Sequence, residues 1–225
     1  MKFVRIVAIV IGVSVALALG GFVAASRKTS SILKTHYESH RIDIPASDPP
    51  AEAIERGKHL VEARYGCTVC HGTNFGGGVM LDDPAIGKLL GPNLTSGKGG
   101  VVAKYTIADW DRIVRHGIMP DGTPALMPSE DYFAMADREL ADIVAYLRSL
   151  PPIDAVVPKS SLGPVGKILV ATGKFPISAA RMQDHQRAHT AQPPPAADSV
   201  EFGGHLIATC TGCHRGNLAG GPMPF

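Results

Sequence analysis

The sequence predicts an all-α protein in which an apolar N-terminal helix precedes one helical domain and the beginning of a second. Between residues 51 and 152, apolar residues recur at helical spacing, and no alternating strands separate these segments. A short motif, Cys-x-x-Cys-His, occurs twice, starting at Cys67 and at Cys210. A chain of 225 residues can hold one or two domains, and the repeated motif favours two.

These observations divide the chain into five expected segments. They are a transmembrane anchor or signal segment (1–28), a tether (29–50), the first domain (51–152), a linker (153–199) and the start of a second domain (200–225). The tether is polar and ends in two prolines, whereas residues 167–171 of the linker could pack on a domain surface.

The N-terminal segment has the composition of a membrane-spanning helix. Two basic residues precede an uncharged run from Ile6 to Ser26, and two more follow it. A run of about 20 residues is long enough to cross a hydrocarbon core of roughly 30 Å as a helix. The competing interpretation is a signal peptide, for which residues 23–25 offer small side chains at a plausible cleavage site. The length of the run favours the retained anchor.

The first domain contains recognisable helix boundaries. We expect one helix over 51–65 and a second with Thr106 as N-cap, Asp109 reaching back to it, and Gly117 and Pro120 ending it. We expect a short third helix, opened by Ser129 or Asp131, and a fourth over 138–150, capped by Asp137 and ended by Pro151. The apolar stripe of the fourth helix consists of Leu140, Ile143, Val144 and Leu147.

The repeated motif carries the chemistry. Cys-x-x-Cys-His is the attachment site of c-type haem, in which two thiols form thioethers with the porphyrin and the adjoining histidine binds iron. The candidate residues are Cys67, Cys70 and His71 in the first copy and Cys210, Cys213 and His214 in the second. A redox-active dithiol does not need the histidine, and a zinc site usually brings its cysteine pairs within a few tens of residues. Two haem c groups are therefore expected.

The remaining ligands of the first iron are expected from two loops. A ligating histidine needs an acceptor for its other ring nitrogen, and the Pro92 carbonyl is the candidate, with an ordinary proline turn as the alternative. A methionine sulfur commonly occupies the opposite side of the iron. Met127 is preferred, since Pro128 restrains it to an extended conformation, while Met119 remains an alternative and Met135 is expected in the core.

Two histidine pairs could in principle bind a metal. His36 and His40 are four residues apart, as are His185 and His189. Neither pair has a third ligand nearby in the sequence. We therefore expect no metal role, and we expect His185 and His189 to be exposed.

The first domain resembles a class I cytochrome c domain of the bacterial di-haem, membrane-associated type. The similar stretches are RGKHLVEARYGCTVCHG, GPNLT, ALMPSEDYF and LADIVAYLRSLPP. The resemblance implies a small helical bundle whose first and last helices cross beside the haem, with Met127 as distal ligand. It also implies that Gly57 lets these helices approach and that Tyr146 packs where they cross.

The residues after the second motif align without gaps with those after the first. His71, Asn74 and Met80 fall opposite His214, Asn217 and Met223. Because Met80 is not the preferred ligand, Met223 is not expected to be one, and too few residues follow His214 to enclose a haem. We therefore expect the sequence to be a fragment cut inside its second haem domain.

The expected function is electron transfer at the periplasmic membrane surface, because covalent haem is attached outside the cytoplasmic membrane. The resemblance implies redox partner proteins: a periplasmic dehydrogenase or quinol donor, and an oxidase or soluble cytochrome as acceptor. A net charge of +2 without a basic patch gives no indication of nucleic-acid binding. The alternative is a haem enzyme with an open sixth position, such as a di-haem peroxidase or a thiosulfate-oxidising cytochrome. Cleavage of a signal peptide would leave the protein soluble in the periplasm.

Overall fold

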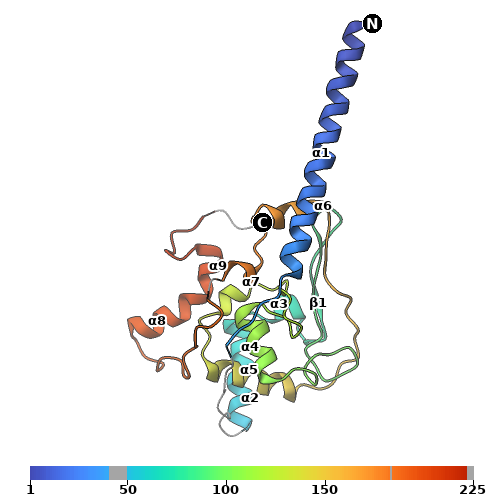
Figure 1. The fold of residues 1–225 in the computed structure, drawn as a ribbon. Helices are drawn as coiled ribbons and strands as arrows, with labels where there is room; N and C mark the ends of the chain where they lie inside the picture. The colour runs from blue at the N-terminus through green and yellow to red at the C-terminus, as the bar shows by residue number, and fades with distance from the viewer. Residues whose placement is uncertain (41–49, 183, 222–225) are drawn as a thin grey trace.

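The computed structural model describes residues 1–40, 50–182 and 184–221 (Figure 1). Its helices are α1 (Lys2–Lys34), α2 (Pro50–His59), the π-helix η1 (Leu60–Arg64), α3 (Thr68–His71), α4 (Ile107–His116), the 3-10 helix η2 (Ser129–Tyr132), α5 (Asp137–Ser149), α6 (Pro164–Ala171), α7 (Ser178–Arg181), α8 (Val200–Ile207), the 3-10 helix η3 (Ala208–Cys210) and α9 (Thr211–His214). Strands β1 (Gly78–Asp83), β2 (Gly87–Gly91) and β3 (Ser161–Leu162) form one antiparallel sheet in that order.

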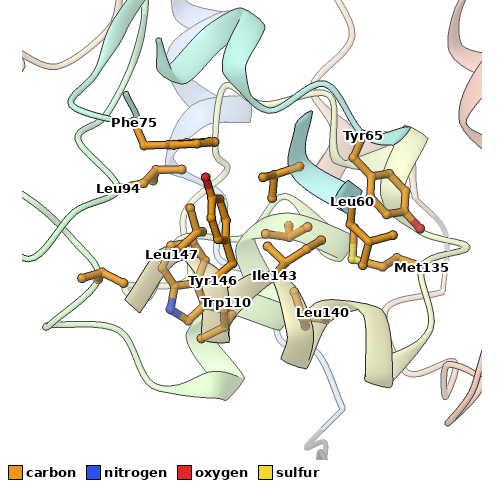
Figure 2. Packing of buried hydrophobic residues seen from close by; sticks show 14 residues of the cluster. Leu60, Tyr65, Phe75, Leu94, Trp110, Met135, Leu140, Ile143, Tyr146 and Leu147 are labelled. Carbon is orange, nitrogen blue, oxygen red and sulfur yellow. The ribbon is translucent and has the colours of Figure 1, made fainter. Parts of the chain in front are cut away.

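The core forms where α2 and η1 pack across α5. Gly57 makes this crossing possible, because a Cβ there would overlap the Asp142 carbonyl oxygen and lie 2.8 Å from the Tyr146 Cβ. The expected roles of Gly57 and Tyr146 are thus confirmed. The predicted apolar stripe of α5 is buried in the same cluster (Figure 2), together with Trp110 from α4 and Met135 from the preceding loop.

Helix capping follows the sequence in α4 but not in α5. Thr106 caps α4 and exchanges hydrogen bonds with Asp109, and Gly117 ends the helix with φ +67°. Asp137, predicted as the cap of α5, is instead its first residue, and Ala136 is the cap. The Asp137 carboxylate instead accepts a hydrogen bond from the buried Arg115 (2.8 Å), so it does not cap α5.

The three-stranded sheet departs from the all-α prediction. Strands β1 and β2 form a hairpin whose turn is held by Asp83, which accepts hydrogen bonds from the backbone N–H groups of Ala85 (2.8 Å) and Ile86 (2.7 Å). The adjacent side chains of Val79 and Met80 in β1 are both exposed, so this strand lacks the alternation of buried and exposed residues that β2 shows around the buried Leu89. The all-α prediction is therefore incomplete.

Helix α1 extends beyond the predicted span and projects away from the rest of the fold (Figure 1). It is long and apolar enough to cross a membrane, a property that a signal sequence shares. Its C-terminal part packs beside α6, where the Thr29 hydroxyl donates to the Lys167 carbonyl oxygen (2.6 Å). Tyr37 N–H donates to the Gly122 carbonyl oxygen (2.9 Å). The described part of the expected tether, 29–50, therefore contacts the domain, while its residues 41–49 lie outside the described residues.

The expected linker, 153–199, also packs on the first domain. Helix α6 lies against the sheet and α1, which agrees with the expectation for residues 167–171. Farther along, Ser178 and Ala179 are buried. The carbonyl groups of Thr190 and Ala191 accept hydrogen bonds from the first N–H groups of α5, at 2.9 and 3.1 Å. Backbone from the linker thus does the capping that Asp137 does not.

Candidate haem site

The first Cys-x-x-Cys-His motif follows a change of helix type. The α2 helix widens into the π-helix η1, in which Tyr65 N–H donates to the Leu60 carbonyl oxygen over five residues (2.8 Å). Cys67 N–H then donates to the Val61 carbonyl oxygen (2.9 Å). The motif continues as the short helix α3, with Cys67 as its N-cap and His71 as its last residue. Both thiols and the His71 imidazole therefore lie on one turn of helix.

The β1–β2 hairpin brings Pro92 to His71. Gly91, at the end of β2, lies so close to the motif that a Cβ would overlap the Cys70 carbonyl oxygen. The next residue is Pro92, whose carbonyl oxygen is 3.0 Å from His71 Nδ1. Because a carbonyl only accepts, the proton of the neutral ring lies on Nδ1 and Nε2 keeps its lone pair. Strands β1 and β2, which the sequence did not predict, thus place the Pro92 carbonyl, which the sequence did predict as the acceptor for His71.

Asn93 and Thr95 hold this loop, and the sequence did not single them out. Both side chains are fully buried. Asn93 Oδ1 accepts from Thr95 N–H and from the Thr95 hydroxyl, each at 2.8 Å, while its amide donates to the Ile153 carbonyl oxygen at 2.7 Å. A polar pair inside an otherwise apolar GPNLT stretch is the signal that could have identified them. They fix the chain on both sides of Leu94.

Met127 lies partly buried against the same hydrophobic cluster as Cys67. Its carbonyl oxygen accepts from Ser129 N–H (2.8 Å) across Pro128, whose φ of −76° and ψ of 59° form an inverse γ-turn. The buried hydroxyl of Ser178 donates to the same oxygen (3.0 Å). The position of Met127 is thus set by its own turn and by the linker, which sequence reasoning did not anticipate.

The other methionines have different surroundings. Met135 is 2% exposed in the core, as expected. Met80 is 42% exposed, and its sulfur lies 3.3 Å from Cys70 Sγ. Met119 is partly exposed in the loop after α4.

The thiols of the first motif are not those of a redox-active dithiol. Burial raises the pKa of Cys67 to about 12 and also raises the pKa of Cys70. A reactive dithiol needs a lowered pKa, because the thiolate is the nucleophile. Burial also lowers the pKa of His71, against the opposing effect of the Pro92 carbonyl. The imidazole is therefore neutral near pH 7, as a metal ligand must be.

The surroundings of the motif fit a haem. Trp110 is 3% exposed, and its Nε1–H has no hydrogen-bond partner among the described residues. A buried donor without a protein partner fits an acceptor that comes from outside the chain, such as a haem propionate. The hydrophobic cluster that contains Trp110 also contacts Cys67 and Met127. One hydrophobic cluster is thus bordered by a candidate attachment thiol, Cys67, by the candidate ligand Met127 and by the Trp110 N–H group, which is unpaired within the described part of the chain.

The second motif has a different environment. Cys210, Cys213 and His214 are exposed on η3 and α9, and none of α8, η3 and α9 contains a buried residue. This segment contacts η2 of the first domain, where a Cβ on Gly212 would overlap the Asp131 carboxylate. Met223, the counterpart of Met80, lies outside the described residues.

The histidine pairs are arranged differently from the prediction. His185 and His189 are partly buried rather than exposed, because both pack against His116 on α4. His40 joins them, with its ring centroid 5.5 Å from that of His116. His36 instead lies near Gly122. Burial, reinforced by the neighbouring basic groups, lowers the pKa of His116 and of His189 to about 3.

Comparison with known proteins gives a consistent result for the first domain. Residues 54–151 match the model of the family described as cytochrome c. The match covers the first motif, the Pro92 loop, Met127 and α5, and it stops before the linker and the second motif.

Three curated relatives are named as cytochrome subunits of bacterial dehydrogenases. The fructose dehydrogenase cytochrome subunit of Gluconobacter japonicus is 31% identical over 60% of this chain and 30% of its own length. The cytochrome c subunit of a quinone alcohol dehydrogenase from Gluconacetobacter polyoxogenes is 33% identical over 45% of this chain and 23% of its own. The gluconate 2-dehydrogenase cytochrome c subunit of Pantoea cypripedii is 32% identical over 41% and 22%.

The matched regions span less than a third of the length of these relatives. Within the matched domain, this chain holds two thiols and a histidine on a short helix, an acceptor behind the histidine and a methionine loop ahead of the last helix. Residues 54–151, which hold these groups, are thus similar to the cytochrome c family.

Proposed function

We propose that this chain is an electron carrier, with haem c attached to Cys67 and Cys70 and its iron held between His71 and Met127. The observation that carries the proposal is the hydrogen bond from His71 Nδ1 to the Pro92 carbonyl oxygen, 3.0 Å long, because it leaves Nε2 free as a ligand. When bound, haem supplies a one-electron couple, with iron alternating between the ferric and ferrous states.

In this proposal, residues of the chain occupy both axial positions of the iron, so that no substrate can bind there. Pro92 fixes the tautomer and orientation of His71, and Asn93 holds Pro92 in turn. The turn at Pro128 and the Ser178 hydroxyl hold the Met127 backbone in one position. A histidine and methionine pair raises the reduction potential of haem iron, and burial in the apolar cluster disfavours the ferric charge. These residues thereby tune a potential rather than activate a substrate.

The proposal includes a second haem c at Cys210, Cys213 and His214. Its motif lies against η2, which follows the Met127 loop, so electrons could pass between neighbouring sites. Its distal ligand is not assigned. We propose the periplasmic face of the inner membrane as the location, with α1 as a retained anchor, or the soluble periplasm if α1 is a cleaved signal.

The proposed partners are redox proteins. The three relatives are named as subunits of fructose, alcohol and gluconate dehydrogenases, which favours a periplasmic dehydrogenase as electron donor. An oxidase or a soluble cytochrome would be the acceptor. Contacts between redox partners are usually small and transient, so we expect weak complexes.

Replacing Met127 tests the carrier function. In Met127→Ala the sixth position should open, so that carbon monoxide binds the reduced protein rapidly. The reduction potential should also fall by a fraction of the roughly 0.8 V range that axial ligands span. Both are measured on the haem-loaded protein, by stopped-flow absorbance and by redox titration.

Two further variants make the result specific. Met119→Ala and Met135→Leu should leave the first haem six-coordinate, with carbon monoxide binding as slowly as in the unaltered protein. The rival class, a haem enzyme with an open sixth position, predicts rapid binding before any substitution. That outcome at the first haem would reject the carrier proposal, whereas rapid binding only in Met119→Ala would move the ligand to Met119.

A further inference from the structure

A second group of metal-binding side chains lies outside the candidate haem site, between α4 and the segment after α7. Asp111 and His116, both on α4, are 0% exposed. His189 approaches from the later segment, and one ligand atom from each of the three residues lies within 4.8 Å of the others. His116 Nε2 is 3.0 Å from His189 Nε2 and 3.8 Å from Asp111 Oδ2.

The hydrogen bonds of His185 determine where the ring proton of His116 lies. His185 Nε2 is 3.0 Å from the Ala179 carbonyl oxygen, which can only accept, so His185 carries its proton on Nε2. Its Nδ1 is then an acceptor for His116 Nδ1–H, 3.3 Å away. A neutral His116 has no second proton. Its Nε2 is therefore a lone pair that faces His189 and Asp111.

The other two groups at this point are also acceptors. His189 also makes a hydrogen bond to the backbone of Phe133, where a carbonyl oxygen takes its ring proton. Its Nε2 is then a second lone pair, only 3.0 Å from the first. Asp111 Oδ2 is buried and has no hydrogen-bond partner among the described residues. Three acceptors without a donor are costly inside a protein, and a cation would satisfy all of them.

A fourth donor faces the same space. The His40 ring centroid is 5.5 Å from that of His116 and 5.6 Å from that of His189. His40 Nδ1 lies 3.3 Å from the His185 carbonyl oxygen, which leaves Nε2 as a lone pair. This Nε2 is buried and, within the described part of the chain, has no hydrogen-bond partner.

We propose that Asp111, His116 and His189 bind a divalent transition-metal ion, with His40 as the fourth ligand and zinc as the occupant. Imidazole nitrogens and one carboxylate suit zinc, which prefers four tetrahedral ligands. Metal–ligand bonds of about 2.0–2.2 Å require ligand atoms roughly 3.3 Å apart. The 3.0 and 3.8 Å separations at His116 Nε2 lie on either side of that value.

The ion would act as a structural clamp. Its ligands come from the chain before α2, from α4 and from the linker, which are far apart in sequence. His189 directly precedes Thr190, whose carbonyl oxygen caps α5 at 2.9 Å from Asp137 N. Binding a metal at His189 should therefore hold this cap and the linker in place. The clamp is independent of the proposed electron-carrier role.

Metal analysis tests the site on the haem-loaded protein. After treatment with EDTA and dialysis against Zn²⁺, elemental analysis should find one zinc per chain in addition to haem iron. Zinc X-ray absorption should show only nitrogen and oxygen ligands at about 2.0–2.2 Å and no sulfur at about 2.3 Å. Zinc should also raise the midpoint of thermal unfolding, since a ligand that binds only the folded state stabilises it.

Variants separate this site from other zinc ligands. His189→Gln, at a partly exposed position, and His116→Gln should weaken zinc binding by at least the roughly 10–100-fold that loss of an outer-shell partner costs. His59→Gln, an exposed histidine outside the cluster, and the pair Cys210→Ser with Cys213→Ser should bind zinc as the unaltered protein does. Absence of zinc in the unaltered protein, undiminished binding in His189→Gln, or a sulfur shell would overturn the proposal.

Discussion

Asp131 lies where the second motif meets the first domain, and its ionisation should affect stability. Burial raises the pKa of Asp131 to about 6, the neighbouring Glu130 carboxylate adds to the rise, and Arg181 opposes it. The unfolded value is about 3.9. Between these values the folded protein holds more protons than the unfolded chain, so stability should fall as pH rises from about 4 to about 6.

The variant Asp131→Asn removes this titration. Compared with the unaltered protein, it should gain about 1 kcal/mol of stability at pH 7 but little at pH 4, after allowance for partial exposure. Urea unfolding of the oxidised protein, followed across this pH range, measures the difference. Glu130→Gln should keep a reduced form of the pH dependence, because its carboxylate only contributes to the shift. An equal gain at both pH values would show that the ionisation of Asp131 is not responsible.

The crossing of α2 and α5 depends on Gly57, and its repeat counterpart offers a matched control. In Gly57→Ala the new Cβ would overlap the Asp142 carbonyl oxygen, so the helices must separate, at a cost of about 1–3 kcal/mol or more. In the sequence, Gly203-Gly204-His205-Leu206 parallels Gly57-Lys58-His59-Leu60, so Gly203 is the counterpart of Gly57 and His205 that of His59. Gly203 has no heavy atom within 4 Å of the position that a Cβ would occupy. Gly203→Ala should be neutral or stabilise by up to about 1 kcal/mol. Thermal unfolding of both variants checks this, and equal effects would contradict it.

Local signals explain which elements could be predicted. The α4 boundaries followed from Thr106, Asp109 and Gly117, because capping needs only residues a few positions apart. The Cys-x-x-Cys-His motif and the Pro92 acceptor are local in the same sense. The hairpin was missed because β1 shows no alternation of buried and exposed residues and β2 has only five residues. It is held by an Asp83 turn and by backbone packed against Cys70.

Other features depend on residues that only the fold brings together. The histidine cluster joins His40, His116 and His189, which are separated by more than seventy residues along the chain. No spacing rule reveals such a set, and each pair alone resembled an exposed helical pair. The support that Ser178 gives to Met127 is likewise non-local, since it comes from a segment that the composition suggested was only a linker.

The N-terminal helix can be separated from the rest of the molecule. Thr29 is its one buried residue, and the apolar side chains before residue 20 are exposed. If α1 is a retained anchor, the mature protein should keep its N-terminal segment and remain in the membrane fraction. A form in which a cleavable signal replaces residues 1–26 should be released into the periplasm with an unchanged haem spectrum. Intact-mass measurement checks this, and a mature N-terminus after residue 25 would favour the signal peptide.

Glu139 connects the second-motif segment to the first domain. It is 4% exposed and accepts hydrogen bonds from Arg64, from the Tyr65 hydroxyl (3.1 Å) and from Ala136 N–H (2.9 Å). His205, on α8, approaches the same carboxylate at 3.1 Å, and its carbonyl oxygen accepts from Arg64 at 2.9 Å. One buried carboxylate thus links η1, α5 and α8.

Removing the α8 side of this link should loosen the second-motif segment without disturbing the first haem. A hydrogen bond to a charged group contributes about 1.5–3 kcal/mol, so in His205→Ala amide hydrogen exchange over residues 200–214 should accelerate by roughly 10–100-fold. The absorbance spectrum of the first haem should not change, because His205 hydrogen-bonds to Glu139, whereas His71 is held by Pro92. His59→Ala, the exposed repeat counterpart, should leave exchange unaltered. If exchange over 200–214 stays the same in His205→Ala, the segment is held by its contact with η2 instead, and the Asp131 variants then become the decisive ones.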